Sequence, residues 1–167
     1  GFPDPAGATV MRHLLSAVAF LHARSIVHRD VKCENIFQVE ARGDVALERA
    51  TFQLGDFGFA TELLKDEVLL GTVGSPSTAA PEVMCGRPYA HPADMWSSGA
   101  VLFTALAARR PYESSCHGTK DASVDLKGEP WDMVSEGALN LLGALLQSDP
   151  ARRPSADKAL GHNWLRQ

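Results

Sequence analysis

The segment 92–108 constrains the fold more than any other part of this sequence, because it is apolar on most of its sides. Its large apolar residues recur at helical spacing, and they include Trp96, Val101, Leu102, Phe103 and Leu106. A helix at a protein surface keeps a polar face, whereas a helix that is apolar nearly all round has to be buried. We therefore expect a central helix around which the rest of the chain packs.

Three other segments are predicted to form helices that cover this central one. Residues 4–24 begin with aspartate and proline, which read as an N-cap and a first helical residue, and continue with apolar residues at three- and four-residue spacing. Ser135 is predicted to cap a helix whose buried face carries Leu139, Leu142, Leu145 and Leu146. Ser155 is predicted to cap a last helix that runs to about Trp164.

Strand signals are few and short. Extended segments are predicted at 26–27, 36–39 and 51–54, and a turn signal at Gly43-Asp44 separates the last two. Residues 56–91 are rich in glycine and proline and show no sustained periodicity, which in a compact domain indicates a functional loop. These patterns predict one domain that is mostly α-helical, with a short β-hairpin.

Composition excludes several classes of protein. The net charge is -4, so we expect neither a nucleic-acid partner nor attraction to an anionic membrane. No apolar run is long enough to span a bilayer. The cysteines Cys33, Cys85 and Cys116 are widely spaced, which predicts free thiols and no disulfide or zinc site. We expect a location in the cytoplasm or the nucleus, and no secretion.

Three polar clusters carry the chemistry, and they lie on or beside predicted loops. They are H-R-D-V-K-C-E-N at 28–35, D-F-G at 56–58 and A-P-E at 80–82. A single tripeptide occurs by chance, and a lone Asp30 or Asp56 reads as a turn or capping residue. All three clusters in this order, with strand-like runs between the first two, are far more specific.

Together the clusters resemble the signature motifs of protein kinases. Downstream segments are similar to further kinase motifs: D-M-W-S-S-G at 94–99, D-P-A-R-R-P-S at 149–155 and H-N-W-L at 162–165. The resemblance therefore covers essentially the whole chain. It implies the C-terminal lobe of a protein kinase, a helical bundle with short β-hairpins at the catalytic cleft. Lys32 and G-S-P at 74–76 resemble serine/threonine kinases, most closely the calmodulin-dependent and energy-sensing group.

The resemblance implies transfer of a phosphoryl group from Mg-ATP to a serine or threonine hydroxyl of a protein substrate. Asp30 would accept the proton of that hydroxyl, and Lys32 would place a positive charge at the transferred group. Asn35 and Asp56 would supply oxygen ligands of the kind that Mg²⁺ prefers. With Lys32 and Glu34 they form the expected nucleotide and metal site, because the hairpin between them lets 35 and 56 converge.

Other residues have structural roles by the same resemblance. His28 and Phe57 are expected to stack and, with Gly58, to anchor the D-F-G segment. Ser75 is expected to bond near the catalytic aspartate and lysine. Asp94 is expected to hydrogen-bond the backbone of residues 28–35, which the resemblance identifies as the catalytic loop. Finally, a buried ion pair is expected between two residues far apart in the chain, Glu82 and Arg153.

Arg29 resembles the kinase arginine that pairs with a phosphate on the activation segment, the stretch closed by A-P-E at 80–82, and orders that segment. Thr72 is the nearest candidate for that phosphorylation, but Gly71 stands where many relatives carry the phosphorylated threonine. Alternatively, the segment is ordered without phosphate. Thr78 is a second departure, since relatives usually carry tyrosine there.

The motifs of a kinase N-terminal lobe, a glycine-rich G-x-G-x-x-G loop and a V-A-I-K strand lysine, do not occur in the sequence. We therefore expect residues 1–167 to be a C-terminal lobe that lacks its N-terminal lobe, a fragment that does not turn over ATP efficiently by itself. Two alternatives stay open. One is a pseudokinase-like scaffolding module without catalysis, and the other is a phosphotransferase of the aminoglycoside or choline type.

Overall fold

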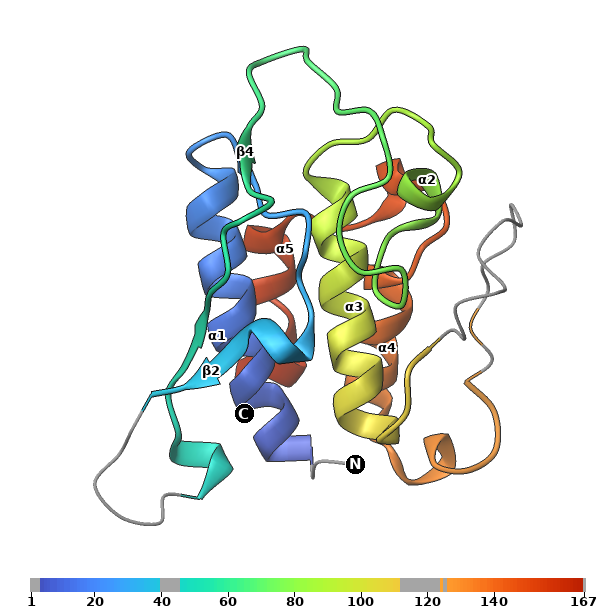
Figure 1. The fold of residues 1–167 in the computed structure, drawn as a ribbon. Helices are drawn as coiled ribbons and strands as arrows, with labels where there is room; N and C mark the ends of the chain where they lie inside the picture. The colour runs from blue at the N-terminus through green and yellow to red at the C-terminus, as the bar shows by residue number, and fades with distance from the viewer. Residues whose placement is uncertain (1–3, 40–45, 112–123, 125, 167) are drawn as a thin grey trace.

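The computed structural model describes residues 4–39, 46–111, 124 and 126–166 (Figure 1). Its α-helices are α1 (Asp4–His22), α2 (Pro81–Met84), α3 (Pro92–Ala107), α4 (Glu136–Leu145) and α5 (Ala156–Leu160). Its strands are β1 (Ile26–Val27), β2 (Ile36–Gln38), β3 (Phe52–Leu54) and β4 (Thr61–Glu62). Short 3-10 turns lie at Cys33–Asn35, Leu47–Arg49, Trp131–Met133, Pro150–Arg152 and Asn163–Arg166. The prediction of a mostly α-helical domain with short strands is confirmed.

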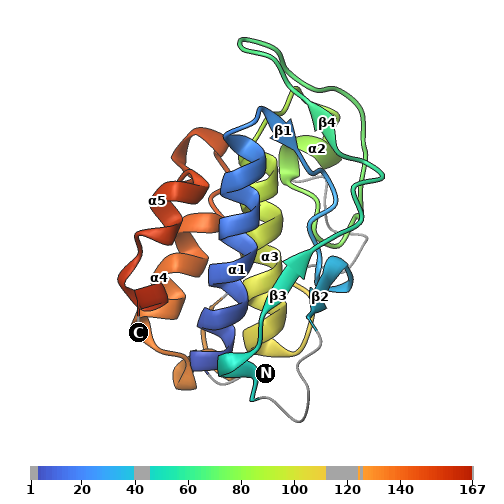
Figure 2. The ribbon, with the colours of Figure 1, turned by 90° about the vertical axis from the view of Figure 1, so that its left-hand side faces the viewer.

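The apolar segment forms the buried central helix that was predicted. Every residue of α3 from Ala93 to Phe103 is buried, and α1 and α4 both pack against it. Gly99 permits the close approach of α4, since a Cβ at this position would lie 2.9 Å from the Cβ of Leu145. Figure 2 shows α4 and α5 on one side of α1 and the β2–β3 hairpin on the other.

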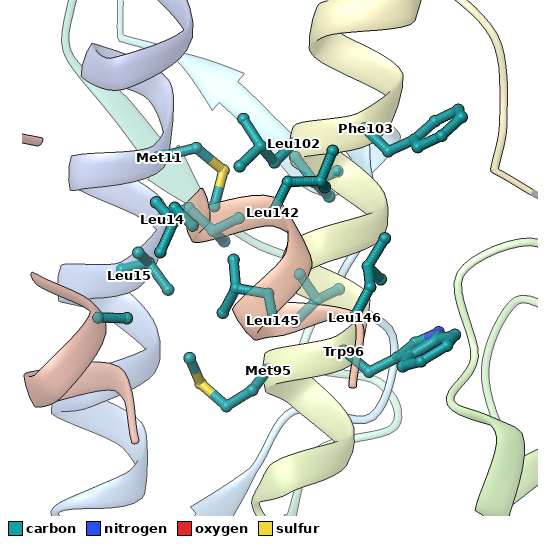
Figure 3. Close-up of a cluster of buried hydrophobic side chains, with 14 of the residues drawn as sticks. Met11, Leu14, Leu15, Met95, Trp96, Leu102, Phe103, Leu142, Leu145 and Leu146 are labelled. Carbon is teal, nitrogen blue, oxygen red and sulfur yellow. The ribbon is translucent and has the colours of Figure 1, made fainter. Parts of the chain in front are cut away.

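The core lies between the helices, where apolar side chains from α1, α3 and the α4 region meet (Figure 3). The largest of them are fully buried, and each contributes about 1.5–3 kcal/mol to stability by its removal from water. They include Met11, Leu14, Leu15, Met95, Trp96, Leu102, Phe103, Leu142 and Leu145. This packing fixes α3, and with it the residues at its first turn.

The predicted cap of α4 is confirmed, because the side chain of Ser135 accepts a hydrogen bond from the amide of Ala138. Ser155 caps α5 in the same way, but the prediction that this helix continues to about Trp164 is wrong. The helix ends at Leu160, and the chain turns at Gly161. The turn lets Trp164 become fully buried, in contact with α1 and α4.

The predicted hairpin is confirmed, with Ile36 paired to Leu54, Phe37 to Gln53 and Gln38 to Phe52. Its turn signal at Gly43-Asp44 lies outside the described residues. The extended segment Ile26–Val27 was also predicted, but its partner was not: it pairs with Thr61–Glu62, in the segment predicted to be irregular.

Two further observations concern membrane-spanning helices and cysteines in the described residues. Within the described ranges, no helix is long and apolar enough to cross a membrane. Cys33 and Cys85 are exposed free thiols, and Cys116 lies outside the described residues.

Candidate active site

The catalytic loop is fixed to the start of the central helix. Asp94, in the first turn of α3, is buried, and its two carboxylate oxygens accept the backbone amides of His28 and Arg29, each at 2.9 Å. The Nε2 atom of His22, the last residue of α1, lies 2.9 Å from the same carboxylate. The sequence predicted that Asp94 would hold this backbone, but nothing in the sequence signalled His22.

Three residues singled out in the sequence, Lys32, Asn35 and Ser75, converge on the carboxylate of a fourth, Asp30. Asp30 is 2% exposed, and one of its oxygens accepts the backbone amide of Ser75 at 2.8 Å. Its other oxygen accepts the Lys32 ammonium at 2.6 Å and the Asn35 amide at 3.3 Å. The Lys32 ammonium also donates to the Ser75 hydroxyl, at 2.9 Å. The result is a buried anion with a lysine beside it.

Two opposing effects set the pKa of Asp30. Burial, the largest effect, raises it, but hydrogen bonds from Lys32 and Ser75 together outweigh burial, so the pKa is lowered from its ordinary value of 3.8. Asp30 is therefore ionised at neutral pH. An ionised, fixed carboxylate can orient a hydroxyl group and accept its proton.

Gly74 makes the contact between Ser75 and Asp30 possible. Its φ is +92°, a backbone conformation that other residues rarely adopt. A Cβ at this position would overlap the carbonyl oxygen of Arg29. Only glycine allows the two loops to approach this closely, which brings the next amide onto the carboxylate.

Asn35 precedes β2 and Asp56 follows β3, so both residues lie at the open end of the hairpin. At this end the Gly55 amide donates a hydrogen bond to the Asn35 carbonyl at 2.9 Å. The Asn35 side chain uses its amide nitrogen for both contacts to Asp30, and its amide oxygen remains as a ligand atom. Asp56 is exposed, and one carboxylate oxygen accepts the Gly58 amide at 3.3 Å.

The Asn35 amide oxygen and the Asp56 carboxylate suit a hard cation that takes its remaining ligands from groups outside this chain. Nowhere in the described ranges do three His, Cys, Asp or Glu side chains gather closely enough to hold a metal ion by themselves. Mg²⁺ at kinase-type sites needs only one or two protein groups, with phosphate oxygens and water as the other ligands. Asn35 and Asp56 therefore fit such an ion.

His28 links the catalytic loop to the D-F-G segment. It is fully buried, its Nδ1 accepts the Asp30 amide at 3.3 Å, and its Nε2 lies 3.2 Å from the Gly55 carbonyl oxygen. This pair of partners assigns the hydrogen to Nε2. The ring contacts Phe57, with centroids 5.2 Å apart and planes tilted by 59°, although Phe57 is 52% exposed.

The expected ion pair between Glu82 and Arg153 is formed. Two parallel hydrogen bonds of 2.6 and 2.8 Å join the groups, and both residues are buried. The remaining N–H groups of Arg153 donate to the carbonyl oxygens of Pro92, Gln147 and Ser148. Every donor of the guanidinium is therefore satisfied, and the ion pair connects the A-P-E segment to the segment 149–155.

Three predicted site residues lie apart from the Asp30 cluster. Glu34 is exposed and contacts Arg110 at 3.2 Å. The Nε atom of Arg29 donates to the Phe59 carbonyl at 2.6 Å. Thr72 is exposed, and its hydroxyl donates to the carbonyl of Val83 at 3.3 Å.

The sequence matches the protein kinase domain family over residues 2–165, so this chain belongs to the protein kinase family. It is 36% identical to the calcium/calmodulin-dependent protein kinase cmkA of Emericella nidulans over 99% of its own length and 40% of that protein. It is 33% identical to calcium-dependent protein kinase 12 of rice (99% of this chain, 31% of the relative) and 31% identical to the serine/threonine-protein kinase PEPKR2 of Arabidopsis thaliana (98% and 34%). The chain thus spans only 31–40% of these relatives.

Proposed function

We propose that this chain provides the metal-binding and hydroxyl-activating side of a serine/threonine protein kinase, which transfers the γ-phosphoryl group of Mg-ATP to a protein. The observation that carries the proposal is the cluster around Asp30, where a buried, ionised carboxylate meets Lys32, Asn35 and Ser75. A scaffolding module would have no need of this arrangement.

In this mechanism the residues of the chain mainly position the reacting groups and neutralise negative charge. Asp30 orients the substrate hydroxyl and accepts its proton, and its hydrogen bonds to Ser75 and Asn35 keep it in place. The Lys32 ammonium stabilises negative charge that develops on the transferred group. Asn35 and Asp56 would hold Mg²⁺, which neutralises phosphate charge when bound.

We place residues 1–167 as the C-terminal lobe and assign the nucleotide-covering loop and strand lysine to an N-terminal lobe of the same kinase. By itself the chain should then not turn over ATP efficiently, since binding of the phosphates needs both lobes. The absence of G-x-G-x-x-G and V-A-I-K patterns from the sequence supports this division. We also place the protein in the cytoplasm or nucleus, in agreement with its unpaired Cys33 and Cys85.

The test is phosphorylation of a serine/threonine peptide library by the protein that carries this chain together with an N-terminal lobe. Asp30→Asn should lower kcat by about a hundredfold or more, because the base is lost. Asp132→Asn changes an exposed aspartate far from the cluster in sequence and should have no effect. Undiminished transfer by Asp30→Asn would refute the assignment, and efficient transfer by residues 1–167 alone would refute the division into lobes.

A further inference from the structure

The segment 59–83 is attached to the body of the protein in its unmodified state. At its beginning, β4 pairs with β1, and the Leu63 amide donates to the Ser25 carbonyl at 2.6 Å. The segment then arches beyond the ends of the helices (Figure 1). These contacts join backbone to backbone and need no phosphate.

A second attachment lies in the middle of the segment. Leu69 and Tyr89 exchange two backbone hydrogen bonds, of 2.8 and 3.0 Å, and form an isolated antiparallel bridge. Tyr89 is 4% exposed and belongs to the main apolar core. The bridge therefore connects the segment 59–83 to the apolar core of the protein.

Arg29 provides a third attachment, and it is the residue that the kinase resemblance pairs with a phosphate. Its Nε donates to the carbonyl of Phe59 at 2.6 Å, so the guanidinium already contacts the segment. The contact is charge-assisted, and such hydrogen bonds are roughly twice as strong as neutral ones. One N–H donor of the guanidinium that is expected to bind a phosphate is thus already bonded to the unmodified backbone.

The residues nearest the expected phosphorylation site also disfavour a phosphate. Gly71 has a φ of +89°, a conformation in which a β-branched residue such as threonine is strained. Thr72, the next residue, donates its hydroxyl hydrogen to the Val83 carbonyl, which also accepts the Gly86 amide at 3.0 Å. A phosphorylated threonine has no hydroxyl hydrogen to donate, and its negative charge would face a carbonyl oxygen.

We propose that the segment 59–83 is ordered by contacts of the unmodified chain, and that phosphorylation of Thr72 releases its middle part, where Leu69 pairs with Tyr89. This is the opposite of the ordering role that a phosphate on this segment would have by resemblance. Only the expected effect of Thr72 phosphorylation on catalysis rests on the proposed function. Its structural part stands on the contacts of Arg29, Leu69 and Thr72.

Hydrogen exchange of the Leu69 amide tests the structural part directly. In phosphatase-treated protein this amide should be protected. Thr72→Val removes one weak hydrogen bond and should speed exchange about two- to fivefold. Phosphothreonine installed at position 72 should speed it about tenfold or more, because charge repulsion is added. Phosphothreonine at Thr51, an exposed residue outside the segment, is the control and should change nothing. An unprotected Leu69 in unmodified protein, or unchanged or slower exchange on phosphorylation of Thr72, would overturn the proposal.

A pair of proline variants tests the bridge without phosphorylation. Leu69→Pro removes the amide that donates to Tyr89, whereas Leu70→Pro alters a residue that is 67% exposed and whose amide makes no backbone contact within the described segments. Circular dichroism establishes that both variants are folded. Exchange across residues 59–83 should rise at least about tenfold more in Leu69→Pro than in Leu70→Pro. Equal exchange in the two folded variants would contradict a clamping role for the bridge.

Kinase activity of the protein with its N-terminal lobe separates the two proposals. If the proposed function holds, phosphothreonine at position 72 lowers kcat/KM and Thr72→Val lowers it less. If the protein has no activity at all, the function fails while the exchange results still decide the structural part. Activation by phosphothreonine at position 72 would overturn the release of the segment even in an active enzyme.

Discussion

The guanidinium of Arg153 and the carboxylate of Glu82 form two parallel hydrogen bonds, of 2.6 and 2.8 Å, in the interior of the protein. The pair joins α2, at the end of the segment 59–83, to the turn before α5. Removal of either partner leaves the charge of the other buried and unpaired.

Glu82→Gln and Arg153→Met should therefore each lower the free energy of unfolding by about 3–5 kcal/mol. Urea denaturation measures the loss. The exposed pair of Glu34 and Arg110 is the matched control, and Glu34→Gln should cost no more than about 1 kcal/mol. Similar losses in the buried and the exposed pair would show that burial of the ion pair does not matter to stability.

Gly74→Ala should destabilise the protein by about 2 kcal/mol or more, because the backbone at φ +92° is strained for alanine and the new methyl group meets the Arg29 carbonyl. The contact from Ser75 to Asp30 would open as well, so kinase activity should fall. Gly143→Ala is the control: it lies inside α4 with open space around it and should stabilise the protein by about 0.5–1 kcal/mol. A neutral Gly74→Ala would refute the requirement for glycine.

The stability of the protein should fall as the pH drops below about 6.5. The pKa of His91 is lowered by burial and by neighbouring His22, against the opposing effect of Asp94. A histidine with a lowered pKa binds its proton more readily in the unfolded chain, so its contribution is present above 6.5 and is lost as the pH falls toward its folded pKa. His91→Gln should flatten the pH dependence of the urea midpoint between pH 7.5 and 5.5, as measured against the unmodified chain. The slope of that profile would stay the same if His91 did not titrate in this way.

Asp30 should not titrate between pH 5 and 8, because its pKa lies below 3.8. An acid limb in the pH profile of kcat/KM within that range must then come from another group, such as the substrate or the nucleotide. Lys32→Met removes a hydrogen bond that lowers this pKa, and burial should then raise it. The carboxyl resonance of Asp30 in NMR spectra measures both values, and a titration near neutral pH in the unmodified protein would contradict the prediction.

Side chains that repeat along one element were predictable from the sequence, whereas long-range backbone contacts were not. The apolar run identified α3 as the buried helix, and the resemblance to kinase motifs singled out Asp30, Asn35 and Asp56. The bridge between Leu69 and Tyr89 joins main-chain groups that every residue possesses, so it leaves no pattern in the sequence.

Two further differences have local physical causes. Trp131 lies outside every helix and strand predicted from the sequence, yet it is 2% exposed and packs against Phe103, because one large aromatic residue can be buried without any periodic pattern. The helix α5 ends early, at Leu160, because the turn that follows allows Trp164 to be buried in the core. Tertiary packing overrides local preference in both cases.

The attachment of the catalytic loop to Asp94 has a consequence for how this protein tolerates change. Two backbone amides of the loop are held by the first turn of α3, a helix that is buried from Ala93 to Phe103. The position of the candidate active site around Asp30 therefore depends on the packing of leucines and methionines in the core. A conservative exchange near Gly99, far from Asp30 in the sequence, can therefore shift the position of the Asp30 carboxylate by changing how α4 packs on α3. Inherited variants of such a chain should thus be judged first by what they do to the axis of α3.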